Sequence, residues 1–361
     1  MWTGYLINAG RFYNLNRSLI NVRRDVFDNI KNILIIKPGA LGDIVHSLPF
    51  LAALKNHFPA VSIDWVIAHG LHHFLKDHPM IDNLWVIKKD EWKKIRRIGK
   101  SLKEINALSR TLSLRHYDVA VDLSGLFRSG LITYFSKAKI KLGFKASDEG
   151  SPLFYTHKVH GSMCIHAIDR YLEIAKYMGC KPGDIEYPFA PYDPNPEILQ
   201  SLPSVYCIFA PSAGKPANRW IAEKFGRLAS RLHLPAVVTA SASEIDIAEK
   251  VVSHSKGNAV SVAGKTGLKD LPGLIKKASF FICNDTGPMH IAAALNIPVF
   301  AIFGPANPIR TGPYGNNHTV IQHKMDCAPC YRKNPCSHFK CMNELSVDTV
   351  HTTLKETMGV E

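Results

Sequence analysis

Residues 33–43 read Ile-Leu-Ile-Ile-Lys-Pro-Gly-Ala-Leu-Gly-Asp, and residues 280–290 read Phe-Phe-Ile-Cys-Asn-Asp-Thr-Gly-Pro-Met-His. In both stretches a short apolar run, typical of a buried strand, leads through a glycine-containing loop into an amphipathic helix. In an open α/β sheet such a loop lies at the carboxyl edge, where ligands bind, and helix N-termini there attract anions. Because the two loops belong to different halves of the chain, they predict a cleft between two domains.

Strand and helix patterns alternate on both sides of these loops. In the first half, strands are predicted over 33–36, 63–67, 84–87 and 118–123, and helices over 44–57, 101–114 and 165–178. In the second half, strands are predicted over 205–209, 236–239, 259–262, 280–283 and 299–302, and helices over 221–232, 244–253, 271–278, 289–295 and 347–358. Such alternation indicates βαβ units and parallel sheets. The predicted fold class is α/β, with two doubly wound, Rossmann-like domains facing each other across a cleft.

The chain has 361 residues, which is too long for one ordinary core and predicts two domains. Six prolines between residues 181 and 203 mark a linker there. The predicted division is an N-terminal domain over 1–180 with an extension over 1–30, the linker, a C-terminal domain over 204–345, and a final helix within 346–361. Apolar residues between 19 and 30 suit a helix packed on its own domain or a helix at a membrane surface.

The formal net charge of +14 favours an anionic partner: nucleic acid, an acidic membrane surface, or a phosphorylated or carboxylated substrate. No nucleic-acid partner is expected, because the chain lacks a recognition motif and its basic residues are not interleaved with stacking aromatics. No apolar run reaches the roughly 18 to 20 residues of a spanning helix. Charged residues interrupt the apolar residues near the N-terminus, which argues against a signal peptide, so a cytoplasmic protein is expected.

The first loop lacks the Gly-Lys-Ser/Thr of a Walker loop and the three-glycine spacing of dinucleotide-binding folds. Gly39 and Gly42 permit close backbone approach. Asp43 suits a helix N-cap, and a carboxylate at that place in a cleft also suits a general base. His46 lies one turn further on, either as a partner of this site or as an ordinary polar residue.

The second loop also allows two interpretations. Asp285 and Thr286 can cap the following helix, and Pro288 suits its first turn. Alternatively, Gly287 and the amides after it receive a diphosphate, with His290 adding a donor.

A third loop, over residues 211–220, follows the first strand of the second half. Its Ser212, Lys215 and Arg219 are donors suited to phosphate, although a solvated surface turn has a similar composition.

These three loops resemble those of the bacterial lipopolysaccharide heptosyltransferases, ADP-heptose-using glycosyltransferases of the GT-B fold. The resemblance covers nearly the whole chain after about residue 31, and it is carried by residues 35–49, 63–66, 117–126, 151–155, 285–294 and 303–305. The middle segments are closer to heptosyltransferase I, which acts on the inner Kdo, than to heptosyltransferase II. A relative that transfers another sugar is the nearest alternative, and a sugar-nucleotide epimerase is a further one that the loop around Asp43 argues against.

The resemblance implies an inverting transfer of heptose from ADP-heptose to the Kdo/heptose inner core of lipopolysaccharide, with Asp43 as the catalytic base. A helix dipole and cations then stabilise the departing diphosphate, so no metal or other cofactor is expected. The family usually has a lysine at the position of Asn218, which leaves open whether Lys215 or Arg219 meets the phosphate. The implied donor contacts come from Leu41, Gly42, Ser212, Lys215, Arg219, Glu244, Asp285, Thr286, Gly287 and His290.

The acceptor implied by the family, Kdo-bearing lipid A, carries carboxylates and phosphates and sits on an anionic membrane. The basic run Lys93, Lys94, Arg96 and Arg97 is therefore predicted to contact the acceptor or the membrane, although most such runs are solvated helix faces. His46 is grouped with these acceptor contacts. The resulting expectation is a peripheral protein on the cytoplasmic face of the inner membrane.

Four of the eight cysteines gather near the C-terminus with the spacing Cys-x2-Cys-x5-Cys-x4-Cys. Four thiols in so short a segment suit zinc or an iron–sulfur cluster, but the spacing matches no common zinc template closely. Reduced thiols packing an irregular loop are the favoured interpretation, since disulfides are not expected in a cytosolic chain. The cluster consists of Cys327, Cys330, Cys336 and Cys341.

Overall fold

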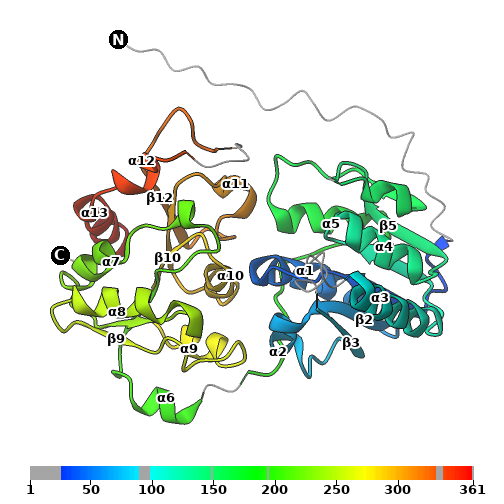
Figure 1. The fold of residues 1–361 in the computed structure, drawn as a ribbon, viewed down its shortest axis with the longest axis horizontal. Helices are drawn as coiled ribbons and strands as arrows, with labels where there is room; N and C mark the ends of the chain where they lie inside the picture. Colours follow the sequence, from blue (N-terminus) through cyan, green and yellow to red (C-terminus); the bar gives the residue numbers. More distant parts are fainter. Residues whose placement is uncertain (1–25, 89–97, 148, 193–194, 331–335, 360–361) are drawn as a thin grey trace.

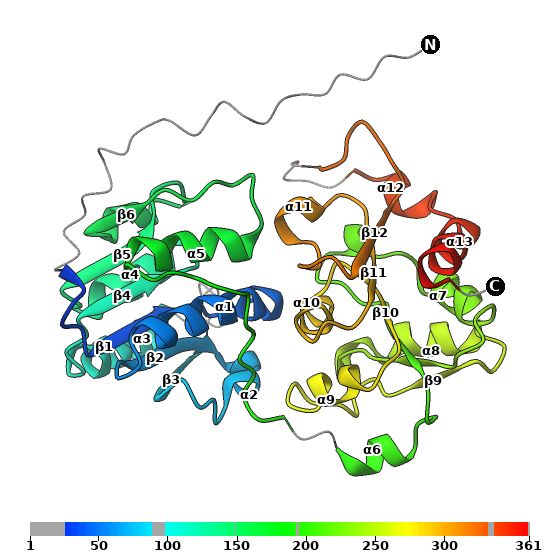
Figure 2. The ribbon, with the colours of Figure 1, turned by 180° about the vertical axis from the view of Figure 1, so that it is seen from behind.

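The computed structural model describes residues 26–88, 98–147, 149–192, 195–330 and 336–359. It confirms the predicted α/β class, because the strands form two parallel sheets of six strands each. Figures 1 and 2 show two lobes, each consisting of one sheet with helices on its faces. No helix in these ranges is both long and apolar enough to cross a membrane.

The first sheet has the strand order β3-β2-β1-β4-β5-β6. Its strands are β1 (Asn32–Ile36), β2 (Ser62–Ala68), β3 (Asn83–Ile87), β4 (Val119–Asp122), β5 (Ile140–Phe144) and β6 (His157–Val159). Its lobe also contains the helices α1 (Leu41–His57), α2 (His72–Leu75), α3 (Ile98–Ser113), α4 (Phe127–Phe135) and α5 (Ala167–Tyr177), and the 3₁₀ helices η2 (His69–Leu71) and η5 (Ser151–Phe154).

The second sheet has the order β12-β11-β10-β7-β8-β9. Its strands are β7 (Cys207–Ala210), β8 (Ala236–Val238), β9 (Ala259–Ser261), β10 (Phe281–Asn284), β11 (Val299–Phe303) and β12 (His318–Gln322). Its lobe contains α7 (Ala222–Ala229), α8 (Ile245–Ser253), α9 (Leu271–Lys276), α10 (Gly287–Ala294), α11 (Pro308–Thr311), α12 (Lys340–Asn343) and α13 (Val347–Met358), with η6 (Pro216–Asn218) and η7 (Ala242–Glu244); the short α6 (Pro196–Gln200) lies in the proline-rich linker.

In both sheets the strand order reverses beside the first strand of the lobe, between β1 and β4 and between β7 and β10. Ligands of open α/β sheets bind at this point, because the connections on either side leave in opposite directions and open a crevice. The loops after β1, β7 and β10 are the three that the sequence singled out. The topology therefore places all three predicted loops at the switch points of the two sheets.

The burial pattern of α1 differs from that of the amphipathic helix that the sequence predicts. Eleven of its 17 residues are buried, and they surround the helix rather than forming one stripe. The reason is that α1 shares a core with strands of its own sheet and packs on α5 and, across the cleft, on α10. Helix α10 is likewise buried along most of its length. Both helices are apolar on the side away from their sheets because the other lobe covers that side.

Several elements lie outside the predicted set. Strand β6 has only three residues, and the outermost strand β12 carries polar, partly exposed side chains, so neither has a clear strand pattern. Helix α4 contains serine, glycine and threonine, which favour helices weakly. In β5, Gly143 interrupts the apolar run because the ring of Tyr155 occupies the place of a side chain. The final helix was predicted at its observed bounds, and it packs against α7 in the core of the second lobe.

Candidate functional site

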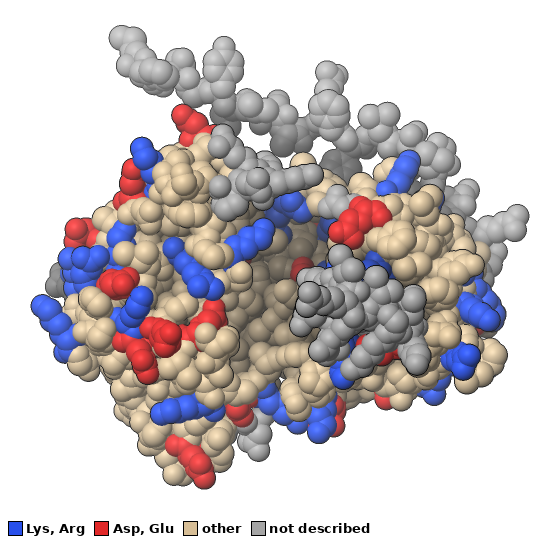
Figure 3. Space-filling model, in the orientation of Figure 1, with Lys and Arg blue, Asp and Glu red and all other residues tan. Residues whose placement is uncertain are grey.

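A cavity of about 960 Å³ lies between the two lobes and is lined by residues of both. Figure 3 shows the surface hollowed there, with lysine and arginine side chains near the rim. The first lobe contributes the start of α1, and the second contributes the loops after β7, β10 and β11 and the cysteine segment. We call this the donor cavity. Of the predicted donor contacts, those that line it are Leu41, Gly42, Lys215, Asp285, Thr286, Gly287 and His290.

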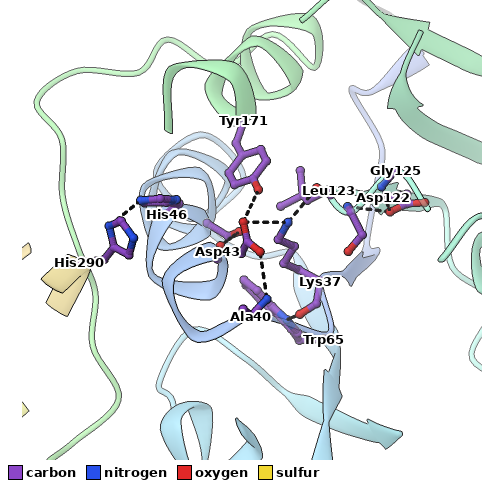
Figure 4. A network of polar contacts seen from close by, with 12 residues as sticks. Lys37, Ala40, Asp43, His46, Trp65, Asp122, Leu123, Gly125, Tyr171 and His290 are labelled. Carbon is purple, nitrogen blue, oxygen red and sulfur yellow. Dashed lines mark hydrogen bonds and ion pairs between the residues drawn. The ribbon is translucent and has the colours of Figure 1, made fainter. Parts of the chain in front are cut away.

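Asp43 is the third residue of α1, and its side chain remains 40% exposed. Its Oδ2 accepts a hydrogen bond from the Ala40 amide at 2.9 Å, so the carboxylate caps the helix from inside rather than as the N-cap residue. Its Oδ1 accepts one from the Tyr171 hydroxyl at 3.5 Å and lies 3.6 Å from Lys37 Nζ (Figure 4). The helix cap and the predicted base are thus the same carboxylate, which Ala40, Tyr171 and Lys37 hold in one orientation.

Lys37 is the buried cation behind this carboxylate, and no sequence pattern predicts a role for it. Its ammonium group donates to the Leu123 carbonyl at 3.2 Å, and its own carbonyl accepts from the Trp65 indole. Burial opposes the charge of Lys37, but Asp43, Tyr171 and Asp122 outweigh burial and raise its pKa. Lys37 therefore stays charged and neutralises Asp43 from the protein side.

Three histidines form one of the polar contacts between the lobes, beside the hydrogen bond from Tyr314 to Asp169 and the ion pair of Lys269 with Asp77. His46 Nε2 lies 2.9 Å from His290 Nδ1, and the His46 ring also packs edge-on against His166. His166 Nε2 in turn lies 3.1 Å from the carbonyl of Gly312 in the second lobe. Burial lowers the pKa of all three, and the pKa of His290 falls to about 3. These rings are neutral at physiological pH, and His46 faces the donor cavity and His290 (Figure 4).

The second loop is not the capped helix start that its composition allows. Thr286 occupies the N-cap position of α10, but its side chain makes no capping hydrogen bond. Asp285 instead accepts a hydrogen bond from Asn218 Nδ2 at 3.0 Å. Pro288 has no N–H and the Met289 amide donates to the Thr286 carbonyl, so the start of α10 leaves the Gly287 amide uncapped by these side chains at the wall of the donor cavity.

The third loop resolves which cation faces the cavity. Lys215 lines it and lowers the pKa of Asp285, although burial outweighs this effect and raises that pKa to about 6. Arg219 points away, because it donates to the Ala213 carbonyl at 2.9 Å and pairs with Glu244 at 3.1 Å. Neither Arg219 nor Glu244 nor Ser212 is among the residues that line the cavity.

A second, smaller cavity of about 290 Å³ adjoins the donor cavity, and Asp43 and Thr311 line both. The loop after β4 forms one wall, and it is shaped by Asp122, whose Oδ1 accepts from the amides of Ser124 and Gly125. No sequence pattern predicts this cavity. Its other lining residues are Lys37, Gly39, Leu123, Ser124, Leu126, Met163, Ile165, Ala167, Arg170, Tyr171 and Arg310.

The four clustered cysteines all line the donor cavity, together with His338. Cys341 is buried, and burial followed by the nearby Cys336 and Cys327 raises its pKa. In the described part of the chain, no group of three or more histidine, cysteine or acidic side chains is arranged to hold a metal ion. The basic run predicted to contact the acceptor, Lys93, Lys94, Arg96 and Arg97, lies outside the described residues.

Comparisons with known proteins agree with this architecture. A sequence model of glycosyltransferase family 9 (heptosyltransferase) matches residues 105–340. A lipopolysaccharide core heptosyltransferase of Haemophilus influenzae is 26% identical over 81% of this chain and 84% of its own length. Lipooligosaccharide heptosyltransferase 2 of Campylobacter jejuni is 27% identical over 90% of this chain and 98% of its own length. The structure of an Escherichia coli heptosyltransferase with ADP has the same fold, with a TM-score of 0.73, 23% identity and coverage of 90% of this chain and 99% of that one.

Proposed function

Since the chain belongs to glycosyltransferase family 9, the heptosyltransferase family, we propose that it transfers heptose from ADP-heptose to the Kdo/heptose inner core of lipopolysaccharide, with Asp43 as general base. The observation that carries this proposal is the position of Asp43 where the donor cavity and the smaller cavity meet. A general base must reach the attacking hydroxyl of one substrate beside the reacting carbon of the other. A carboxylate shared by two adjoining cavities meets this requirement.

In the proposed reaction the acceptor hydroxyl enters from the smaller cavity and attacks the anomeric carbon of the heptose. The new carbon–oxygen bond forms as the bond to the diphosphate breaks, and Asp43 takes the hydroxyl proton. Attack opposite the leaving group inverts the configuration. Tyr171 and the Ala40 amide hold the carboxylate in place, while Lys37 lies on its protein side. Orientation of this kind is a large part of what an active site contributes to the rate.

The departing ADP takes the negative charge into the donor cavity. The Gly287 amide at the start of α10 and the Lys215 ammonium group are the donors that would stabilise this charge. The proposed chemistry requires no metal ion. We also propose that the clustered cysteines are reduced thiols that hold no metal, and elemental analysis of the purified protein tests this second proposal, since about one equivalent of zinc or iron would contradict it.

The acceptor is anchored in a membrane, so the protein is proposed to act peripherally at the cytoplasmic face of the inner membrane. Neutralising Lys93, Lys94, Arg96 and Arg97 together should raise the KM for the lipid acceptor and weaken its dependence on salt. The KM for the donor should stay the same and serves as the control. If the acceptor kinetics do not change, the run is a solvated face.

The proposed function is tested by mixing the protein with ADP-heptose and Kdo2-lipid A and analysing the products by mass spectrometry. Addition of one heptose to the acceptor, with release of ADP, is the expected result. If the protein instead transfers a sugar from a different nucleotide sugar in a panel of donors, it is still a glycosyltransferase, but its donor is not ADP-heptose. Epimerisation of a nucleotide sugar without an acceptor would contradict the proposal.

A further inference from the structure

We propose that the smaller cavity binds an oxyanion carried by the acceptor sugar, a carboxylate or a phosphate, and that Arg310 recognises it from the opposite lobe. This inference rests on the proposed function and specifies how the acceptor is selected. Arg310 belongs to α11 of the second lobe, whereas most of the cavity wall comes from the first lobe. Figures 1 and 2 show α11 at the edge of its lobe that faces α5.

The position of the cavity makes it the place for the acceptor. It shares Asp43 with the donor cavity, so a hydroxyl bound inside it lies beside the proposed base. Its volume of about 290 Å³ is near the lower end of the range for ligand pockets, which suits one sugar unit. The remainder of a lipid-linked acceptor would have to extend beyond the cavity.

The charges that line the cavity favour an anion. The ionic side chains there are Lys37, Arg170 and Arg310 on the positive side and Asp43 on the negative side. Lys37 lies 3.6 Å from Asp43 and offsets its charge. Arg170 donates to the Ala146 carbonyl and lies over the Phe144 ring, so its position is set by the protein.

Arg310 is the cation that a ligand would engage. Its guanidinium group has a contact from Nη2 to the Met163 sulfur at 3.9 Å, and the described residues give it no ion pair. A thioether is a weak acceptor, so exchanging it for an oxyanion gains a charge-assisted hydrogen bond with bidentate geometry.

A second, independent observation points to a ligand in the same cavity. The Ser124 hydroxyl, also in the lining, is buried and has no hydrogen-bonding partner among the described residues. Buried hydroxyl groups normally have a partner, and an acceptor oxygen bound here would provide one. Because Ser124 and Arg310 come from different lobes, a ligand that bonds to both would hold the lobes together while the donor is bound.

The test compares Arg310→Met and Arg310→Lys with the unchanged protein. The control is Arg227→Met, an exposed arginine of α7 in the same lobe that lines neither cavity. We expect Arg310→Met to raise the acceptor KM about 10- to 100-fold, the usual effect of losing one hydrogen bond to a charged group. Arg310→Lys should recover part of the loss. The affinity for ADP and the thermal midpoint should not change, which separates recognition from folding.

Two modified acceptors identify the source of the oxyanion: one with its carboxyl groups reduced to alcohols, and one with its phosphates removed. The modification that removes the recognised group should raise the acceptor KM of the unchanged protein. It should not raise the acceptor KM of Arg310→Met any further. An acceptor KM within twofold of normal in Arg310→Met overturns the inference. If the unchanged protein transfers no heptose, the proposed function fails. Calorimetry with the delipidated acceptor then tests whether the smaller cavity binds the acceptor through Arg310. Weaker binding to Arg310→Met then supports the inference, whereas equal binding, or none to either protein, overturns it.

Discussion

At the scale of single residues, the site depends on one carboxylate that has both a structural and a proposed chemical role. Asp43 accepts a hydrogen bond from the Ala40 amide at the start of α1 and also faces both cavities. A helix cap and a general base impose the same requirement here, which is a carboxylate in a fixed orientation. The two interpretations that the sequence left open are therefore compatible.

Asp43→Asn should lower kcat by at least about 100-fold, the usual contribution of a general base. The amide oxygen keeps the hydrogen bond to the Ala40 amide, so folding and the affinity for ADP should remain close to normal. Steady-state kinetics with a saturating acceptor measure the loss, and calorimetry with ADP is the control. A near-normal kcat would show that another group accepts the proton.

Lys215→Met should weaken ADP binding about 10- to 100-fold, because Lys215 is the cation of the third loop that lines the donor cavity. Arg219→Met is the matched comparison, and its effect should be smaller, since Arg219 is directed to Glu244 and to a carbonyl group. Calorimetry with ADP on both variants measures the difference. A larger loss in Arg219→Met would assign the diphosphate contact to Arg219 instead.

At the scale of elements, the crossing of α1 and α10 sets the geometry of the cleft. A side chain at Gly42 would meet the His290 ring at 2.3 Å, and one at Gly287 would meet Leu41 at 2.9 Å. The two glycines thus allow the helices to approach closely across the cleft. The sequence suggested that these glycines admit a ligand, and the structure adds that each admits the opposite lobe.

Gly42→Ala should displace the His290 ring and break its contact with His46, since the new methyl group and the ring cannot occupy the same place. We expect a lower thermal midpoint and a lower kcat together, because the proposed base and the wall of the donor cavity meet at this crossing. Gly183→Ala is the control, as a side chain there has nothing within 4 Å. If Gly42→Ala behaves like Gly183→Ala, the crossing is more adaptable than its packing indicates.

At the scale of the whole molecule, the neutral histidines couple the contact between the lobes to pH. The pKa of His290 is about 3 in the folded protein, against about 6.5 for an unfolded chain. The unfolded state therefore binds more protons below pH 6.5, and this part of the stability decreases as the pH falls. Asp285 has the opposite effect on stability. Its pKa is raised to about 6 in the folded protein, so as the pH falls the folded state takes up this proton before the unfolded state does.

Between pH 6.5 and pH 5, His290 alone should therefore cost about 2 kcal/mol of unfolding free energy. Comparing denaturant unfolding of the natural protein and His290→Gln across this range isolates the histidine from Asp285. The variant should show a flatter decrease in stability toward acid. Parallel curves would mean that the pKa of His290 is the same in the folded and unfolded states.

The sequence by itself determined the parallel sheets, the two lobes and the three loops. Apolar runs that end at glycine, proline or aspartate mark strand ends, and this signal is local. Asp43, Lys215 and Asp285 were identified in this way, and all three line the donor cavity. Short or polar elements such as β6 and β12 were missed because their residues carry little strand pattern.

Only the tertiary structure decided which groups face each other. His46 and His290 are 244 residues apart in the chain, and Asp43 and Tyr171 are 128 residues apart, so no local spacing relates them. The direction of Arg219 toward Glu244, and of Lys215 toward the cavity, also follows from packing rather than from residue type. The smaller cavity, with Arg310 in its lining, likewise follows from packing rather than from residue type. A local pattern fixes where a strand ends, but the contacts of a side chain depend on segments brought beside it by the fold, and composition alone does not encode them.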